Sequence, residues 1–582
     1  MWCRLSPFPG FTSPQKNLNC SIHTGSMTGG VTYSPQGEGV RSATYAQQQA
    51  PVTEQKEAVG HAVRATYLYA GMADVGQLTH NPAYAQALDR IWGNIVNTRM
   101  HITGGLGAIH GIEGFGPQYL LPNDDAFNET CAAVGNVLFN YRMFLLNKDA
   151  KYLDVAEVAL LNNVLAAVNL EGNRFFYVNP LGADGKYPFN HGTGGRAPWF
   201  GTACCPSNMA RLLPQVQGMT YAHDDKDLYV TFYAETATTA KIAGTEVGIQ
   251  QKTAYPNEGA IEISLSPKKP TDFRLFLRIP TWAGKQFVPG ELYHYLEPVK
   301  EPWKLFLNGK PVEAKFERGF AVLERQWKKG DQVKLVLSME VKTSRCHDNV
   351  EDNRGRLALT RGPFVLCAEG LDNGGATQRF FLGDQADVAK AKVKKTTIPS
   401  GSFIQVSMPA QAITKDGGEE SRELTLTPYY AWNNRGNARM DKRDFDGAIE
   451  DCSRAIEIDP EYVRAWNNRG IAQLRKNNRN EALKDFTRTI ELDPNNPRIC
   501  NNLGLVYGRL GNADEALATF RRVGSEEAAQ HNLTVVMAGY EEESQSVDEP
   551  KGKKVSWEES LKKLYAEHPI ETSRVPKATK LR

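Results

Sequence analysis

The 582-residue sequence lacks several features that would assign it at once to a broad class of protein. It has no run of about 18 apolar residues, which excludes an ordinary transmembrane helix. Its formal net charge is only +2, so charge gives no reason to expect nucleic acid or an acidic membrane as a partner. It has no HExxH motif, which argues against that class of zinc peptidase. The Gly-rich segment 103–111 also lacks the glycine spacing and strand-then-helix frame of nucleotide-binding loops.

Cysteine is sparse, and its nine positions follow no regular spacing. An odd count with irregular spacing disfavours a disulfide framework. The first twenty residues contain no basic segment followed by an apolar core, so the sequence predicts no secretory signal there. We therefore expect a cytoplasmic, reducing environment, in which the cysteines are free thiols or metal ligands.

The composition changes several times along the chain. Residues 1–45 are rich in Gly, Ser, Thr, Pro and Gln, which predicts a poorly ordered arm. Residues 46–222 contain five or six segments with apolar residues three and four apart, which predicts helices. Residues 223–428 consist of short alternating segments separated by turn residues, which is typical of antiparallel β-sandwich domains. Residues 541–582 are highly charged and read as a solvated tail.

The segment 429–540 contains an internal repeat. The string AWNNRG occurs at 431–436 and again at 465–470, which is a period of 34 residues. Glycine, alanine and Asp-Pro positions recur with the same period, and the pattern resembles tetratricopeptide repeats. This resemblance implies an α-helical solenoid that binds a partner protein or peptide on its concave face.

Three cysteines and one glutamate in the helical region could form a metal site. Glu129 and Cys131 lie in NETC, and Cys204 and Cys205 lie in ACCPSN. We call these four residues the thiol–carboxylate cluster, because three thiolates and a carboxylate suit a tetrahedral Zn²⁺ ion. Pro206 is typical of the start of a helix, and a helix N-terminus favours thiolates at the cysteine pair.

One geometric condition applies to this cluster. Residues two apart face different ways on a regular helix, so Glu129 and Cys131 would have to lie in a first turn or in a distorted turn. The alternative is that the four residues are unrelated, since buried free cysteine is common.

A series of longer motifs runs through the helical region: GHAVRATYLY, ITGGLG, LPND, ETCA, FFYVNPL and ACCPSNMARLL. The β-rich region continues the series with LRIPTWAG, LFLNGKPV and DNRGRLALTRGPFVLCAEGLDN. Taken in this order, the motifs resemble glycoside hydrolase family 127 over residues 44–436. The resemblance implies an (α/α)6-barrel catalytic region followed by β-domains. It also implies hydrolysis, with retention, of a glycan that carries terminal β-L-arabinofuranose.

The resemblance assigns a role to each candidate site residue. It implies that Cys204 is the nucleophile, that Glu113 is the general acid and base, and that the thiol–carboxylate cluster holds Zn²⁺. It further implies that His61 contacts the sugar, and it suggests Tyr177 for the wall of the pocket. Without the resemblance, Glu113 reads as a solvated loop acid, His61 as a hydrogen-bonded helix histidine and Tyr177 as a core residue.

The chain departs from the family in the number of its helices. An (α/α)6 barrel needs about twelve helices, whereas residues 52–222 predict five or six, so we expect only a partial barrel. Residues 1–43 do not resemble the other half, and the enzyme would be inactive if that half is essential. The alternative function is a non-catalytic repeat scaffold with a structural zinc site that binds a partner protein.

Overall fold

The computed structural model describes residues 3–4 and 43–545, with gaps at 170, 184–186, 374–376, 378–379, 383–387, 399–400, 415–417, 432–444, 459, 462 and 495–496. The chain divides into two compact units. The first unit comprises residues 1–368 and 379–435, and the second comprises residues 369–378 and 436–582. Most of the predicted arm (1–45) and tail (541–582) lies outside the described residues.

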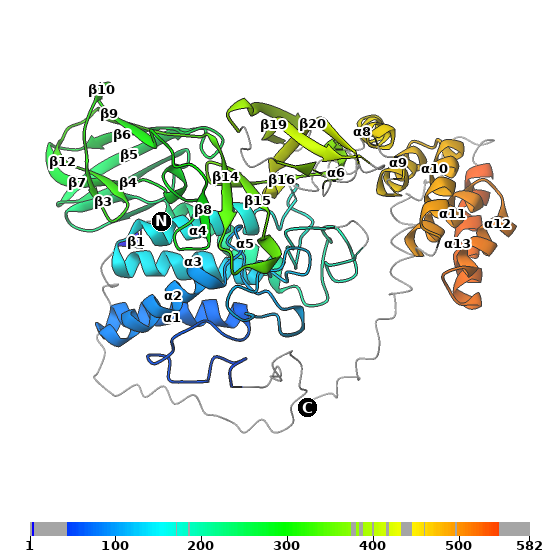
Figure 1. Cartoon of the computed structure of the whole chain (residues 1–582), viewed down its shortest axis with the longest axis horizontal. Coiled ribbons are helices and arrows are strands. Elements are labelled where there is room, and N and C mark those ends of the chain that lie inside the picture. Colours follow the sequence, from blue (N-terminus) through cyan, green and yellow to red (C-terminus); the bar gives the residue numbers. More distant parts are fainter. Residues whose placement is uncertain are drawn as a thin grey trace. The chain divides into compact units, whose positions relative to one another are not determined.

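The first unit begins with a helical region, drawn in blue to cyan in Figure 1. Its helices are α1 (Ala62–Thr79), α2 (Pro82–Thr98), α3 (Thr130–Asn147), α4 (Ala150–Ala159) and α5 (Cys204–Val216). A 3-10 turn (His110–Ile112) follows α2, and a π-helical turn (Leu160–Val164) continues α4. Helix α3 contacts α1, α4 and α5 and is buried over most of its length. This explains why its own apolar residues are found on all of its faces and not on one face only.

Two six-stranded sheets follow and form a β-sandwich (Figure 1). The strand orders are β1-β2-β3-β7-β12-β11 and β10-β9-β13-β6-β5-β4. Buried and exposed residues alternate along β5 and β13, and the buried residues of both sheets belong to one apolar core. The bounds in the first sheet are β1 (Cys3–Arg4), β2 (Tyr221–His223), β3 (Asp227–Val230), β7 (Thr271–Arg278), β11 (Lys315–Glu317) and β12 (Phe320–Trp327). The bounds in the second are β4 (Thr236–Ile242), β5 (Thr245–Thr253), β6 (Ala260–Pro267), β9 (Trp303–Leu307), β10 (Lys310–Pro311) and β13 (Asp331–Leu337).

The pairing within the sandwich is not wholly antiparallel. Strand β3 runs parallel to β7, with Asp227 opposite Arg274 and Val230 opposite Leu277. Strands β4, β5 and β6 lie between β3 and β7 in the sequence and belong to the other sheet. The chain therefore crosses between sheets before it returns, which permits a parallel pair.

A third, eight-stranded sheet completes the first unit, with the order β17-β19-β20-β16-β15-β14-β8 and β18 paired to β19. A separate apolar cluster that includes Val406 and Leu426 lies against this sheet. Its strands are β8 (Tyr293–Tyr295), β14 (Val341–Cys346), β15 (Leu357–Arg361), β16 (Phe364–Ala368), β17 (Phe380–Phe381), β18 (Lys392–Ile398), β19 (Gly401–Ile413) and β20 (Glu419–Pro428).

The second unit is helical and repeats one packing contact. Its helices are α6 (Gly370–Asn373), α8 (Phe445–Ile458), α9 (Val463–Arg475), α10 (Arg479–Leu492), α11 (Pro497–Arg509), α12 (Ala513–Arg521) and α13 (Glu526–Gln545). A Cβ atom added at Gly470 would lie 2.9 Å from the ring of Phe486, and one at Gly504 would lie 2.5 Å from the ring of Phe520. The same glycine–aromatic contact thus recurs in successive helix pairs, as the 34-residue period predicts.

The predicted order of helices, sandwich-forming sheets and a repeat solenoid is confirmed. Within the part of the chain that the structure describes, no helix has the length and apolar character needed to cross a bilayer.

A buried ion cluster joins the helical region to the sandwich. Arg278 of β7 is fully buried, and its Nη1 donates to Oδ1 of Asp154 on α4 at 2.8 Å. Its Nη2 donates to Glu157 on the same helix, and its Nε donates to the carbonyl of Thr231 at 2.7 Å. The second carboxylate oxygen of Glu157 accepts from the Trp282 indole at 3.1 Å. All of these buried charges are therefore paired.

Replacing Arg278 with methionine should destabilise the first unit by about 3–5 kcal/mol, because two buried carboxylates would lose their cation. Lys334→Met is the matched control, since Lys334 pairs with Glu262 on the sandwich surface and such pairs contribute about 0–1 kcal/mol. Urea unfolding of both variants measures the difference. An equal loss for the two variants would contradict the importance of the buried cluster.

Candidate functional site

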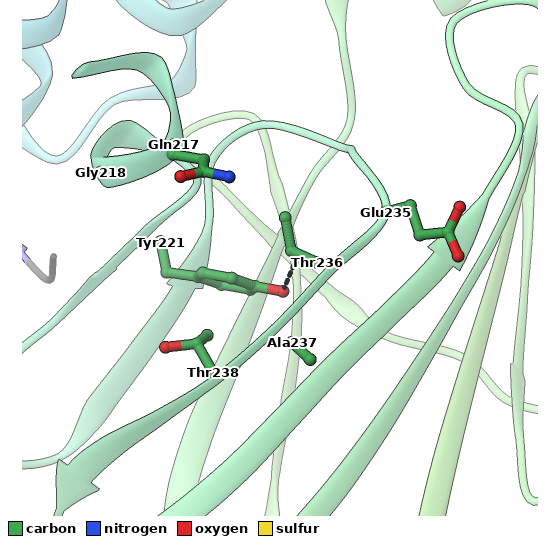
Figure 2. A pocket seen from close by; sticks show the side chains of 7 residues that line it. All are labelled: Gln217, Gly218, Tyr221, Glu235, Thr236, Ala237 and Thr238. Carbon is green, nitrogen blue, oxygen red and sulfur yellow. Dashed lines mark hydrogen bonds between the residues drawn. The ribbon is translucent and has the colours of Figure 1, made fainter. Parts of the chain in front are cut away.

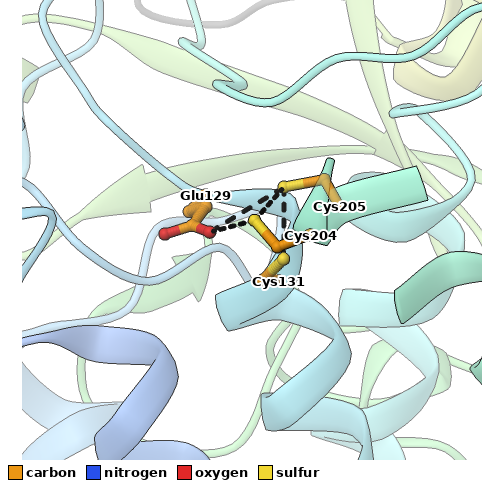
Figure 3. Close-up of side chains that lie close together, drawn as sticks. All are labelled: Glu129, Cys131, Cys204 and Cys205. Carbon is orange, nitrogen blue, oxygen red and sulfur yellow. Dashed lines mark hydrogen bonds between the residues drawn. The ribbon is translucent and has the colours of Figure 1, made fainter. Parts of the chain in front are cut away.

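The structure brings all four members of the thiol–carboxylate cluster together at the starts of α3 and α5 (Figure 3). Their ligand atoms all lie within 4.8 Å of one another. The Sγ atoms of Cys131 and Cys205 are 3.2 Å apart, and those of Cys204 and Cys205 are 3.8 Å apart. Oε1 of Glu129 lies 3.6 Å from Sγ of Cys204 and 3.8 Å from Sγ of Cys205. One ion could therefore contact all four residues.

The spacing of these atoms fits a tetrahedral metal ion. With zinc bonds of about 2.3 Å to sulfur and about 2.0 Å to oxygen, tetrahedral ligands stand about 3.8 Å apart for two sulfurs and about 3.5 Å apart for sulfur and oxygen. Three of the four separations above lie within about 0.3 Å of these values, whereas the Cys131–Cys205 distance is about 0.6 Å shorter. Among the residues that the structure describes, none forms a hydrogen bond with the buried Oε2 of Glu129. The cluster can thus hold a metal ion.

The starts of helices α3 and α5 place the four cluster residues close together. Glu129 is the N-cap of α3 and has an extended backbone (φ −60°, ψ 134°), while Cys131 lies in the first helical turn. The condition set by their two-residue spacing is therefore met. Thr130 fixes this turn, because its amide donates to the carbonyl of Tyr177 at 2.9 Å and its hydroxyl donates to that of Phe176 at 2.8 Å. Helix α5 begins at Cys204, two residues before Pro206.

The protein alone lets one member of the cluster ionise easily. Hydrogen bonds from Cys131 and Cys205 hold the pKa of the Cys204 thiol far below its ordinary value. Burial raises the pKa of Cys205, the hydrogen bond to Cys204 raises that of Cys131, and burial together with the nearby Cys204 charge raises the pKa of Glu129 to about 8. Three of the four donors therefore keep their protons unless a cation replaces them.

Cys204 is the thiol of the cluster that faces solvent. Its side chain is half-buried, whereas Cys131 and Cys205 are 0% exposed. Its Sγ lies 3.2 Å from Oη of Tyr177, so Tyr177 contacts the thiol directly instead of only lining the pocket. A substrate could reach Cys204 without displacing the other two thiols.

Glu113 lies on the carboxylate side of the cluster. It follows the short 3-10 turn and has a left-handed backbone (φ 51°), which is uncommon for a residue with a side chain. Its Oε2 is 3.3 Å from Nε2 of His61, and ligand atoms of His61, Glu113 and Glu129 lie within 4.8 Å of one another. The structure thus gathers every predicted site residue around one place: His61, Glu113, Glu129, Cys131, Tyr177, Cys204 and Cys205.

The structure adds two residues that the sequence did not single out for this site. Asn208 on α5 donates from Nδ2 to Sγ of Cys131 at 3.0 Å, and its Oδ1 accepts from Arg211 at 2.7 Å. Its place three and four residues after the cysteine pair, on the same helix face, was the available signal. The second residue is His191, whose ring centroid lies 4.3 Å from the ring centroid of Tyr177.

A separate cavity of about 300 Å³ lies between the end of α5 and strand β4 (Figure 2). Its lining is mostly polar, and Oη of Tyr221 lies 2.8 Å from Oγ1 of Thr236 there. The lining residues are Gln217, Gly218, Tyr221, Glu235, Thr236, Ala237 and Thr238. No predicted site residue lines this cavity, so it has no part in the arrangement around Cys204.

Family comparisons cover most of the chain. Residues 29–218 match the family described as beta-L-arabinofuranosidase, GH127 catalytic domain. Residues 227–339 match the GH127 middle domain, and residues 341–441 match the C-terminal domain of glycoside hydrolase family 127. Tetratricopeptide repeats match residues 429–462, 463–496 and 486–518. The repeat match therefore begins inside the C-terminal domain match.

Individual relatives agree with the family match. The chain is 34% identical over 423 residues to a non-reducing end beta-L-arabinofuranosidase of Bifidobacterium longum subsp. longum, which covers 69% of this chain and 62% of that protein. A solved GH127 beta-arabinofuranosidase is 42% identical with a TM-score of 0.63 and covers 67% of this chain and 61% of that one. A GH127 beta-L-arabinofuranosidase from Geobacillus stearothermophilus T6 is 33% identical with a TM-score of 0.62 and the same coverage.

The chain thus spans about three fifths of the length of these relatives. Over residues 29–441 it belongs to glycoside hydrolase family 127, and the tetratricopeptide repeats match from residue 429 onward.

Proposed function

We propose that this chain is a retaining glycoside hydrolase that releases terminal β-L-arabinofuranose from a glycan. The observation that carries the proposal is a half-buried thiol of lowered pKa, Cys204, whose Sγ lies 3.6 Å from Glu129. The ligand atoms of Glu129 lie in turn within 4.8 Å of those of a second acid, Glu113. Retaining hydrolysis needs a nucleophile and an acid/base group of this kind. The names of the relatives supply the sugar and its terminal position.

We further propose that the thiol–carboxylate cluster holds Zn²⁺ through Glu129, Cys131, Cys204 and Cys205. The donor set and its spacing support this choice, since zinc prefers thiolate-rich tetrahedral sites. When bound, zinc keeps coordinating thiols deprotonated at neutral pH. Asn208 would then donate to an anionic sulfur at Cys131, which orients that ligand.

In the first step, Sγ of Cys204 attacks the anomeric carbon. The carbon–sulfur bond forms as the glycosidic carbon–oxygen bond breaks, and Glu113 gives its proton to the leaving oxygen. The Tyr177 hydroxyl, 3.2 Å from Sγ, donates to the thiolate and holds it in place.

In the second step, the Glu113 carboxylate takes a proton from a water molecule. The water oxygen attacks the anomeric carbon, the carbon–sulfur bond breaks, and Cys204 returns to its thiolate form. The two displacements each invert the anomeric centre, so the sugar leaves with its original configuration.

Two substitutions test the catalytic roles in the full 582-residue chain. Glu113→Gln should lower kcat on methyl β-L-arabinofuranoside by about 10²–10⁴-fold, the usual contribution of a general acid and base. Cys204→Ser should cost at least as much, because a serine hydroxyl is far less ionised. Release of L-arabinose measures both effects. Cys346→Ser is the matched control, since Cys346 is a half-buried cysteine at the end of β14.

The contrary result would be a chain that shows no turnover, or turnover that neither substitution changes. That outcome favours the scaffold alternative, in which the repeats bind a partner protein or peptide.

Metal content tests the zinc assignment independently of activity. The purified chain should carry about one Zn²⁺, and Cys131→Ser or Cys205→Ser should remove most of it, because each deletes a ligand. Asn208→Ala should weaken zinc binding by about 10–100-fold, as loss of a supporting hydrogen bond does elsewhere. Elemental analysis and competition with a chelator give these values. The control variant Cys346→Ser should keep the metal content of the unmodified chain. An unchanged metal content in both Cys131→Ser and Cys205→Ser would rule the site out.

A further inference from the structure

We infer that His61 is a positioning residue, which caps helix α1 through Nδ1 and is thereby held in the tautomer that donates from Nε2 to Glu113. The inference rests on the proposed role of Glu113 as acid and base. It differs from the role implied by the family resemblance, which is direct contact with the sugar.

The cap determines the tautomer. His61 is the N-cap of α1, with an extended backbone (φ −65°, ψ 118°). Its Nδ1 accepts from the amides of Val63 at 3.2 Å and Arg64 at 3.5 Å, two of the helix-start amides that have no partner within the helix. A ring nitrogen that accepts hydrogen bonds uses its lone pair and carries no hydrogen. The ring hydrogen must therefore be on Nε2.

The other ring nitrogen faces the catalytic carboxylate. Nε2 of His61 lies 3.3 Å from Oε2 of Glu113, and the imidazole is mostly buried, with 13% of its side chain exposed. The edge of the ring also meets the ring of Tyr45, with centroids 5.6 Å apart. A fixed donor at Oε2 leaves Oε1 of Glu113 as the oxygen that carries the transferable proton. His61 thus selects both the orientation of Glu113 and its reacting oxygen.

The backbone holds the two side chains side by side. Ala62 donates its amide to the carbonyl of Glu113 at 3.1 Å, and His61 forms a bridge with Gly114. The approach is close, because a Cβ atom at Gly114 would lie 2.3 Å from the carbonyl oxygen of Gly60. Gly60 and Gly114, which lack side chains, therefore permit the contact between their neighbours His61 and Glu113.

The leaving group separates the two roles of His61. A histidine that bound the sugar would affect all arabinofuranosides alike. A histidine that positions Glu113 affects only substrates whose leaving oxygen needs a proton. Methyl β-L-arabinofuranoside needs that proton, whereas the 4-nitrophenyl glycoside has a leaving group stable enough to depart with little help.

Two substitutions divide the functions of the imidazole. In His61→Asn, the amide oxygen takes the place of Nδ1, and asparagine is a preferred N-cap, so the cap stays while the donor to Glu113 is lost. In His61→Gln, the longer amide brings an N–H group towards the place of Nε2, so the donor stays while the cap is lost. His80→Asn is the matched control, since His80 is an exposed residue at the other end of α1, with a left-handed backbone that asparagine accepts.

We expect His61→Asn to lower kcat/KM for the methyl glycoside by about 10–100-fold, part of the full acid contribution, and that for the 4-nitrophenyl glycoside by less than about threefold. His61→Gln should lower the melting temperature but keep the ratio of the two kcat/KM values near that of the unmodified chain. Equal losses of kcat/KM on both substrates in His61→Asn, or no loss on either, would overturn the inference. The proposed function is decided separately, by the results for Cys204→Ser and Glu113→Gln.

A spectroscopic measurement tests the tautomer of His61 even if the chain shows no turnover. In the chain labelled with 15N-histidine, long-range NMR spectra distinguish the two tautomers, and His61→Asn identifies the signal of His61. We expect the Nε2–H form, with a resonance that Glu113→Ala shifts and that His80→Asn leaves in place. An Nδ1–H form, or a signal that Glu113→Ala does not move, would overturn the inference.

Discussion

The candidate site depends on the crowding of three thiols and a carboxylate at the N-termini of α3 and α5. Four acidic groups within 4.8 Å of one another cannot all be anionic in a buried place without a cation. Without one, the protein leaves the negative charge mainly on Cys204, the thiol that faces solvent. The surrounding structure fixes the position of this cluster. Helix α3 is buried along most of its length, and Thr130 hydrogen-bonds its first turn to the FFYVNPL segment.

Glu113, the proposed acid and base, is held by a different set of contacts. Glu113 is placed by a tight loop and by a close backbone approach between Gly60 and Gly114, which brings it beside His61. The proposed nucleophile thus lies at a helix start, and the proposed acid lies on a loop that is hydrogen-bonded to another helix start. This separation lets Cys204 and Glu113 approach a bound sugar from different elements, as a double displacement requires.

The sequence predicted much of this, for reasons that are local. Periodicities of two, of three to four, and of 34 residues indicated sheets, helices and repeats, and the order of these regions is confirmed. The spacing of Glu129 and Cys131 required a helix start, and the structure has one there. The parallel pairing of β3 with β7, the contact of Asn208 with Cys131 and the orientation of His61 towards Glu113 were not predicted. Each depends on tertiary contacts or on a side-chain direction that no periodicity encodes.

Trapping the covalent intermediate tests whether Cys204 attacks the sugar. Glu113→Gln should slow the second step, so 4-nitrophenyl β-L-arabinofuranoside should load the variant with sugar before water can remove it. Acid quenching and peptide mass spectrometry then locate the adduct. We expect one arabinosyl group on the peptide that contains Cys204, and none in Cys204→Ser. An adduct on Glu129, or turnover in Cys204→Ser equal to that of the unmodified chain, would contradict it.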